Sequence, residues 1–297
     1  MTRTDPPTAT LIVTEALTAQ NNGTAPSDAA EITRGIDYGL EKVKRDLMQL
    51  GKKWRPLLKT DYAVTIAGDA DYANPSDFEA YRKVRLMSGD HADTLSAVAS
   101  TSVMTLKADE DATKVQVDGK WLLITSGTGV NQAKQIKSYV FATKVATMAE
   151  AFSTSPVLGD GYLIVNNMKG LSEYGRGIFE ALAWDWYPGT PARFTVVENA
   201  TVGFMRLHPV PNAVFGLERT YYADLMKLDI TEGSTLLYSS ILRRWAGLFT
   251  QGVYVWALGE DDDRYPRENE IYQSMLVQTA TDDLVGFMGQ APAEQKG

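Results

Sequence analysis

The residues that most often carry chemistry are scarce in this sequence and are not spaced for catalysis. Only two histidines are present, His91 and His208, and neither lies in an HExxH motif or in a triad-like setting. The chain has no cysteine, which excludes a disulfide framework and a thiolate metal site. A transition-metal site would need unusual ligands, so we expect no metal and no cofactor.

Three other segments have the composition of a reactive site but lack its spacing. The glycine-rich run 126–132 is not followed by the Lys-Ser/Thr pair of a phosphate-binding loop. Pro75 and Asp77 can be combined with the later Asp118-Gly119-Lys120 into a metal-dependent nuclease pattern only by force, because the central acid-x-Lys geometry of that pattern is missing. The acidic run Glu260–Asp263 lacks the alternating ligands of a calcium loop, and a solvated turn between helices explains it better.

Paired carboxylates are harder to exclude, because the chain has 37 acidic residues and their separations in space are not encoded in the sequence. A glycan- or nucleic-acid-cleaving enzyme therefore stays open as one hypothesis. No motif supports it, and we predict that the protein is not an enzyme.

Composition and charge indicate a soluble, intracellular globular protein. Apolar residues make up 44% and charged residues 22% of the 297 positions, which is ordinary for such proteins and ample for a core. The net charge of −8 argues against tight wrapping of nucleic acid, although it does not exclude a conduit that DNA merely passes. Neither a signal peptide nor a membrane-spanning segment is expected.

Helical patterns occur at both ends of the chain. Thr8–Gln20 is compatible with a short helix, and Asp28 with Glu31 starts a longer one that ends at Gly51. A single apolar stripe runs along the longer helix: Ile32, Ile36, Leu40, Val43, Leu47 and Leu50. After Asp229 a second helical region carries a broad apolar face, is interrupted at the acidic run, and resumes at Pro266.

The opposite side of the N-terminal helix is basic. We interpret this side either as a solvated face or as a docking surface for an acidic partner ring or for DNA in a channel. Its residues and those that follow it are Arg34, Lys42, Lys44, Arg45, Lys52, Lys53 and Arg55.

The middle of the chain has the period of strands from Tyr62 to about Tyr222. It also holds the densest aromatic cluster, Trp184, Trp186 and Tyr187, which is either core or an interface anchor. Together the patterns predict an α+β fold: a helical bundle made from the N- and C-terminal segments, with a central antiparallel β domain that carries a small β insertion. The expected boundaries are 8–59 with 230–287 for the bundle, 60–120 with 166–229 for the β domain, 121–165 for the insertion, and 288–297 for a flexible tail.

Several short segments resemble, in order, the head-to-tail adaptor proteins of tailed bacteriophages, also called head-completion or tail-tubular-like connectors. They are Trp54-Arg55-Pro56-Leu57-Leu58, the AG…Y…PSDF segment within 59–78, Gly189-Thr190-Pro191 before a strand, and Pro209-Val210-Pro211. The insertion resembles a small β module of phage structural proteins, with the pattern SGTG-x-x-Q…I-x-x-Y…T-x-x-AT…F…P…Y-x-I. The residues that match it are Ser126, Gly127, Thr128, Gly129, Gln132, Ile136, Tyr139, Thr143, Ala146, Thr147, Phe152, Pro156, Tyr162 and Ile164.

This resemblance implies a virion structural protein that is made in the host cytoplasm and works by binding. It implies a ring of twelve copies that joins the portal protein to the next tail or nozzle component, with DNA passing through the lumen and no membrane contact. The candidate contact residues are those of the basic side, the aromatic cluster, and the acidic turn Asp261, Asp262, Asp263 and Arg264.

The alternative is a different structural class: a tail or baseplate component whose small β module binds a receptor or a glycan. The order of helical ends around a central β region favours the adaptor.

Overall fold

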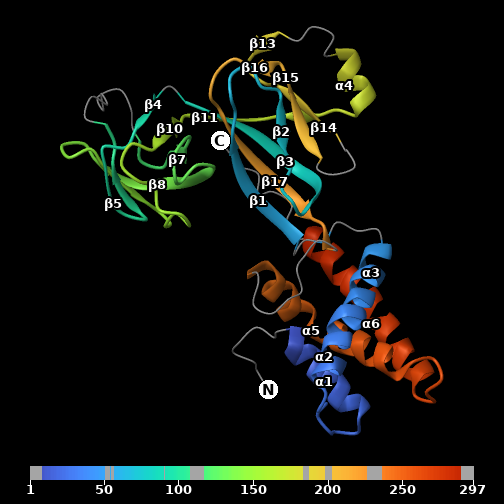
Figure 1. Ribbon diagram of the computed structural model, residues 1–297. Coiled ribbons are helices and arrows are strands. Elements are labelled where there is room, and N and C mark those ends of the chain that lie inside the picture. Colours follow the sequence, from blue (N-terminus) through green and yellow to red (C-terminus); the bar gives the residue numbers. More distant parts are fainter. Residues whose placement is uncertain are drawn as a thin grey trace. The chain divides into compact units, whose positions relative to one another are not determined.

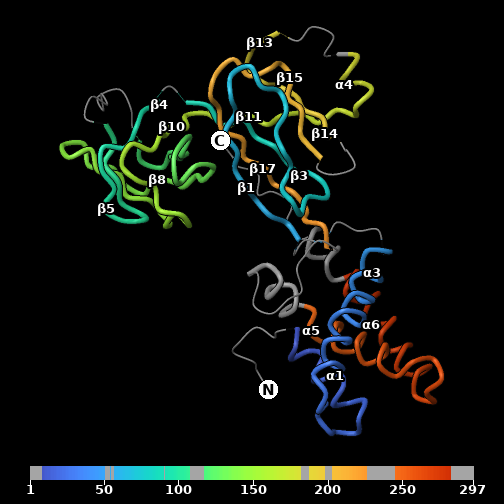
Figure 2. The backbone as a smooth tube through the Cα atoms, in the orientation of Figure 1, coloured from blue at the N-terminus to red at the C-terminus, as the bar shows by residue number. Residues whose placement is uncertain are grey.

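A computed structural model describes residues 9–50, 54, 57–89, 91–107, 117–182, 187–197, 203–225 and 236–288 (Figures 1 and 2). The chain separates into two compact units. One is formed from both ends, within Met1–Leu58 and Tyr222–Gly297, and the other from Lys59–Tyr221.

The first unit is helical. Asp28 starts its longest N-terminal segment by accepting a hydrogen bond from the backbone N–H of Ala30 at 2.9 Å, as a helix N-cap does. The segment continues without a break through a π-helical stretch in its middle. The helices are α1 (Ala9–Gln20), α2 (Ala29–Arg34), η1 (Gly35–Leu40), α3 (Glu41–Gln49), α5 (Leu236–Leu258) and α6 (Tyr265–Met288).

Close packing around α5 holds these helices together. A Cβ added at Gly252 of α5 would lie 2.2 Å from Val43 Cγ2 of α3, and one added at Gly35 of η1 would lie 2.4 Å from Val13 Cγ1 of α1. Only glycine permits such approach, because real Cβ atoms do not come that close to a neighbour. Trp245, where the backbone of α5 is kinked, packs edge-on against Trp54 with ring centroids 5.3 Å apart.

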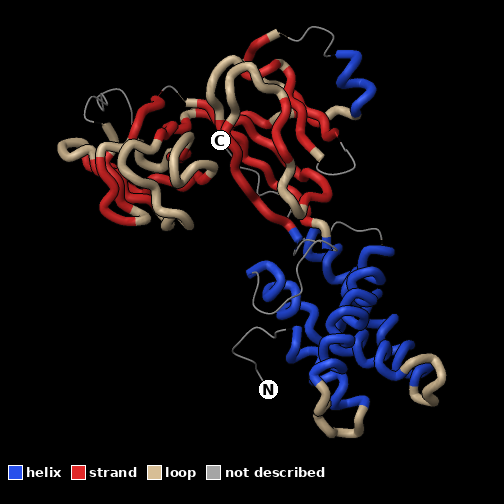
Figure 3. The backbone as a smooth tube through the Cα atoms, viewed as in Figure 1, coloured by secondary structure: helices blue, strands red, loops and turns tan. Residues whose placement is uncertain are grey.

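The second unit is built from sheets (Figure 3). Its organising sheet has the order β1-β17-β3-β11, a second sheet the order β12-β14-β15-β2, and a small one pairs β13 with β16. The short helix α4 (Arg176–Leu182) lies next to β14. The strands are β1 (Leu58–Val64), β2 (Asp71–Ala73), β3 (Phe78–Ser88), β11 (Asn167–Gly170), β12 (Ser172–Glu173), β13 (Pro188–Gly189), β14 (Arg193–Val197), β15 (Phe204–His208), β16 (Val210–Pro211) and β17 (Gly216–Ala223).

Seven further strands form one sheet of order β4-β10-β7-β8-β9-β6-β5. It encloses its own core, in which Leu122, Ile136, Ala146 and Tyr162 are fully buried. A second cluster, around Met87 and Leu123, packs this sheet against β3. The strands are β4 (His91–Thr94), β5 (Ala97–Ser100), β6 (Val103–Thr105), β7 (Trp121–Ile124), β8 (Gln132–Val140), β9 (Val145–Met148) and β10 (Gly161–Val165).

The predicted fold class is therefore wrong. The protein is mixed α+β, but sheets dominate it, and it is not a helical bundle with a β domain carrying a small insertion. The seven-stranded sheet runs from His91 to Val165 and is the largest sheet of the described chain. The sheets are also not wholly antiparallel, since β12 pairs with β14 and β13 with β16 in parallel. Local period identifies strands but does not say which sheet each one joins, and that pairing decided the architecture.

Candidate interface surfaces

The basic side of the N-terminal helix does not form one surface. Lys44 is only 1% exposed and its Nζ lies 2.7 Å from Glu41 Oε1. Lys42 forms an ion pair with Asp46 at 2.7 Å, and its Nζ lies 4.8 Å from the centre of the Tyr272 ring. These two lysines therefore stabilise the packing of the helical unit. Among the residues of this basic side that the structure describes, Arg34 and Arg45 are the exposed ones.

Lys52, Lys53, Arg55, Trp184 and Trp186 lie outside the described residues, as does most of the predicted tail. Tyr187 is described and is 51% exposed. Its ring packs edge-on against His208, with centroids 5.4 Å apart, and Phe179 of α4 contacts the same imidazole at 6.1 Å. Burial lowers the pKa of His208, and the nearby charge of Arg193 lowers it further. His208 thus has a packing role between α4 and the strands.

The acidic turn splits into structural and exposed residues. Asp262 accepts hydrogen bonds from Arg264 Nε at 3.0 Å and Nη2 at 2.9 Å, and the pair lowers the pKa of Asp262 to about 2. Arg264 also donates to the carbonyl of Gln20, at the end of α1, at 3.4 Å. This pair fixes the turn between α5 and α6, whereas Asp261 and Asp263 are exposed.

The segment 59–78 ties the organising sheet together through charged hydrogen bonds. Arg219 of β17, which is 6% exposed, donates to both oxygens of Asp61 at 3.0 and 2.6 Å. Asp77 accepts from Tyr221 at 3.0 Å and from Lys59. Burial is the main cause that raises the pKa of Tyr221. Bidentate arginine–carboxylate pairs are strong and directional, so these contacts fix the register of β1, β3 and β17.

The glycine-rich loop of the seven-stranded sheet is filled by the chain itself. Asp160, which is 4% exposed, accepts from the backbone N–H groups of Thr128 at 3.2 Å, Gly129 at 3.2 Å and Val157 at 3.0 Å. Gln132 joins the same two loops through the carbonyls of Gly129 and Thr154, at 3.2 and 3.1 Å. The N–H groups that an anion would need are already bonded to Asp160, and the SGTG motif therefore locks two loops together.

One end of the second unit carries apolar side chains on a rigid loop. Tyr72 Oη donates to the carbonyl of Asp69 at 2.8 Å and accepts from the N–H of Ile66 at 3.1 Å. This holds the loop 65–70 in place, yet Ile66 is 64% exposed. Backbone hydrogen bonds from Gly68 to Pro211 at 2.8 Å and from Val210 to Tyr187 at 3.2 Å join this loop to two neighbours.

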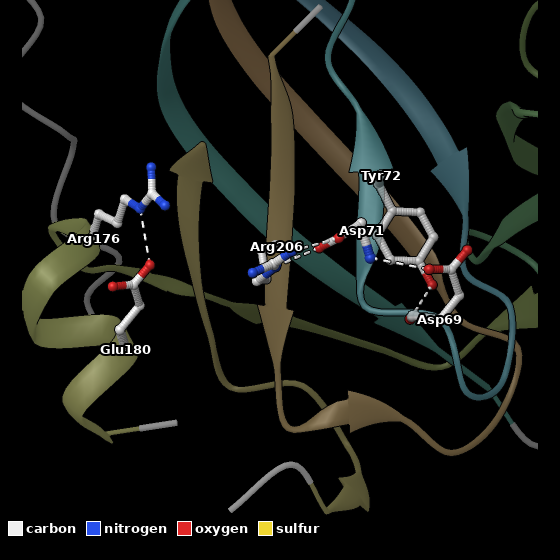
Figure 4. Close-up of polar contacts among 6 residues, drawn as sticks. All are labelled: Asp69, Asp71, Tyr72, Arg176, Glu180 and Arg206. Atoms are coloured by element: carbon white, nitrogen blue, oxygen red, sulfur yellow. Dashed lines mark hydrogen bonds and ion pairs between the residues drawn. The ribbon is translucent and has the colours of Figure 1, made fainter. Parts of the chain in front are cut away.

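We call Ile66, Tyr187 and Val214 the apolar loop end, because the three exposed side chains lie on these joined loops. Figure 4 shows the polar support beside it. Arg206 of β15 points to Asp71 of β2 and donates to its two oxygens at 2.6 and 2.7 Å, and Arg176 pairs with Glu180 along α4 at 2.8 Å.

Sequence reasoning missed the apolar loop end and the role of Asp160. The first was hidden because Ile66 continues the alternation of Tyr62 and Val64, which predicts a buried side chain, whereas β1 ends at Val64 and Ile66 is exposed. The role of Asp160 did leave a signal in the sequence. Asp160 is a lone acid just before a Gly and a strand, and it follows a glycine-rich loop that lacks a phosphate-binding lysine.

The described residues contain neither a candidate metal site nor a helix that could span a membrane. Within the described ranges, no group of three or more His, Cys, Asp or Glu side chains is placed to hold a metal ion. None of the helices in the described part of the chain is both long and apolar enough to span a membrane.

No protein-family model matches the sequence, and no curated protein matches it either. The geometry above and the resemblance in its short motifs are therefore what a functional proposal has to build on.

Proposed function

We propose that this protein is a virion structural protein, a head-to-tail adaptor whose ring links a portal protein to the next tail component and forms part of the DNA conduit. The observation that carries the proposal is that the chain forms two compact units of different construction. Its two ends form one helical unit, and the middle forms a sheet unit that presents the apolar loop end on rigid loops. An adaptor needs two such separate binding bodies, one for each partner.

The physical basis is preorganised binding. Exposed apolar and aromatic side chains held on a rigid support bind at a low entropic cost, and aromatic residues are typical anchors of interfaces. The internal ion pairs, such as Asp61 with Arg219, fix the sheet that carries these loops. In this proposal the apolar loop end binds the tail component and the helical unit binds the portal.

The test combines electron microscopy with a variant of one surface. Wild-type protein mixed with the portal and the tail component of the same virion should give a ring that bridges both. The double variant Ile66→Asp/Val214→Asp should still dock on the portal but should lose at least about tenfold in affinity for the tail component, because two charges would be desolvated at the contact.

Leu158 provides the matched control. It is 70% exposed and lies in the seven-stranded sheet part, so Leu158→Asp should leave tail binding unchanged. If wild-type protein binds no portal at all, the adaptor function is wrong. If Leu158→Asp abolishes tail binding and the Ile66/Val214 variant does not, the assignment of the tail-binding surface is wrong.

A second candidate is a tail or baseplate component that binds a receptor or a glycan through the seven-stranded sheet part. The Asp160-locked loops favour it, because they present Val157 and Leu158 with 45% and 70% of their surfaces exposed. Binding of the purified protein to host cells, lost in Leu158→Asp, would support this candidate instead of the adaptor.

A further inference from the structure

The N-terminal helical segment has a second stripe, on the side away from the core. The core stripe is buried at Leu40, Val43 and Leu47. Glu41, Arg45 and Met48 of α3 follow each other at spacings of 4 and 3, which places them on one helical face. Arg34 and Tyr38, at the start of the π-helical stretch and within it, are exposed ahead of them. We call this set the outer stripe. Tyr38 is 60% and Met48 38% exposed.

The composition of the outer stripe is that of a contact surface. Arg, Tyr and Met are among the residue types enriched at protein–protein interfaces. Glu41 is engaged by Lys44 at 2.7 Å, and the two arginines outnumber the exposed acid beside them, Asp37, so the exposed part of this face has a net positive charge.

A complementary face lies on α6 of the same unit. Glu270 and Val277 are seven residues apart, which places them on one side of α6, and both are exposed, Val277 by 63%. The turn just before α6 adds the exposed residues Asp261 and Asp263. Arg267, three residues before Glu270, is also exposed on this side, but the three acids outnumber it. This face therefore combines the exposed Val277 with a net negative charge, as the outer stripe combines apolar side chains with a net positive charge.

The two faces run in the same direction. Gly39 and Val43 of the N-terminal segment lie against Val253 and Gly252 of α5, so α5 runs opposite to that segment. Gln251 of α5 donates to the carbonyl of Glu268 at 3.2 Å, and Gly247 lies against Met275, so α6 reverses the direction again. Hence α6 is parallel to α3.

Tyr272 of α6 contacts α3, so it shows which positions of the two helices lie at the same level along their axes. Its ring lies under Lys42 Nζ, and its Oη donates to Asp46 Oδ2 at 2.8 Å, so position 272 is level with position 44. Because parallel helices rise equally per residue, Glu270 and Val277 lie within about one turn of Arg45 and Met48, respectively. Asp263 lies in the turn that precedes α6, at the same end of the helical unit as Arg34. A second copy generated by rotation about an axis parallel to the helices has its residues at the same levels along that axis.

We infer that the outer stripe of one copy binds the α6 face of a second copy of this chain, head to tail, with Arg34 opposite Asp263, Arg45 opposite Glu270 and Met48 opposite Val277. The contact joins two different surfaces, which is what a closed ring requires. The inference rests on the ring proposed above and identifies the residues that close it.

Disulfide trapping tests this contact directly, because the natural chain has no cysteine. Full-length Met48→Cys and Val277→Cys proteins are mixed and oxidised, and the mixed dimer is quantified. Using two single variants excludes a bond within one chain. We expect the mixed dimer to form at least about tenfold faster than either homodimer, since a disulfide needs Cα atoms within about 7 Å.

Tyr38→Cys mixed with Val277→Cys is the matched control. Tyr38 lies on the same stripe but ten residues from Met48, which is ~15 Å along the helix, so this mixture should react no faster than the homodimers. Arg45→Glu or Glu270→Arg, introduced alone, should slow the Met48/Val277 reaction, and the two together should restore it.

Each other outcome overturns the inference. A faster Met48→Cys homodimer would show a symmetric contact, a faster Tyr38 mixture would show another register, and equal rates throughout would show no contact. Rings that form on the portal without this cross-link would refute the contact and leave the adaptor function standing. A cross-link without any portal binding would refute the adaptor function and leave the contact standing.

Discussion

Replacing Gly252 by alanine should destabilise the helical unit, against the usual effect of Gly→Ala in a helix. A Cβ at this position would lie 2.2 Å from Val43 Cγ2 and 2.8 Å from Tyr272 Cε2, and Val43 and Tyr272 are both fully buried. Overpacking of a dense core costs ~1–3 kcal/mol, whereas the gain in helix propensity is at most ~1 kcal/mol. Subtracting the full propensity gain leaves a net expected loss of up to ~2 kcal/mol.

Gly247→Ala, in the same helix, is the matched control and should raise the free energy of unfolding instead of lowering it. Its Cβ would lie 3.4 Å from the mobile end of Met275, an ordinary contact, and Gly247 is exposed. The helix propensity gain of up to ~1 kcal/mol should then remain.

Guanidinium chloride unfolding, followed by the circular dichroism of the helices, measures both variants. The double variant Val43→Ala/Gly252→Ala should lose less stability than the sum of its single changes, because removing the Val43 methyl groups relieves the clash. If Gly252→Ala proved as stabilising as Gly247→Ala, the close packing of α3, α5 and α6 would be refuted.

Two further changes probe the second unit and the charged tyrosine contacts. Asp160→Ala removes the acceptor of three backbone N–H groups and should cost ~3–5 kcal/mol, seen as an earlier unfolding transition in the intrinsic tryptophan fluorescence. Asp93→Ala, at a solvent-exposed ion pair with Lys107, should leave the unfolding transition almost unchanged. Burial and the hydrogen bond to Asp46 raise the pKa of Tyr272 above its ordinary value of 10.0, so its contribution to stability is complete below pH 10.0 and falls as the pH rises further, where the unfolded chain ionises first. Tyr272→Phe should flatten this alkaline loss in a pH series of unfolding curves, and an unchanged slope would contradict the assigned cause.

The sequence by itself determined the local elements for which period and capping suffice. The stripe Leu40, Val43 and Leu47 is buried, and Asp28 caps its helix, because both signals lie within a few residues of each other. The sequence could not separate Lys44 from Arg45: the two are adjacent basic residues, and only packing showed that the first is buried and the second exposed.

Only the tertiary structure decided which strands share a sheet and which charges are internal. Strand β4 pairs with β10 and Asp61 binds Arg219, and no local pattern indicates either partner. The sequence around Asp160 does carry a local signal, but only the fold shows that Asp160 accepts a hydrogen bond from Thr128, some thirty residues earlier in the chain. Strand pairing and buried ion pairs form between residues distant in sequence, and their free energy depends on burial that exists only once the chain has folded. The same reason hid the apolar loop end, since exposure of Ile66 is a property of the surface and not of the residue.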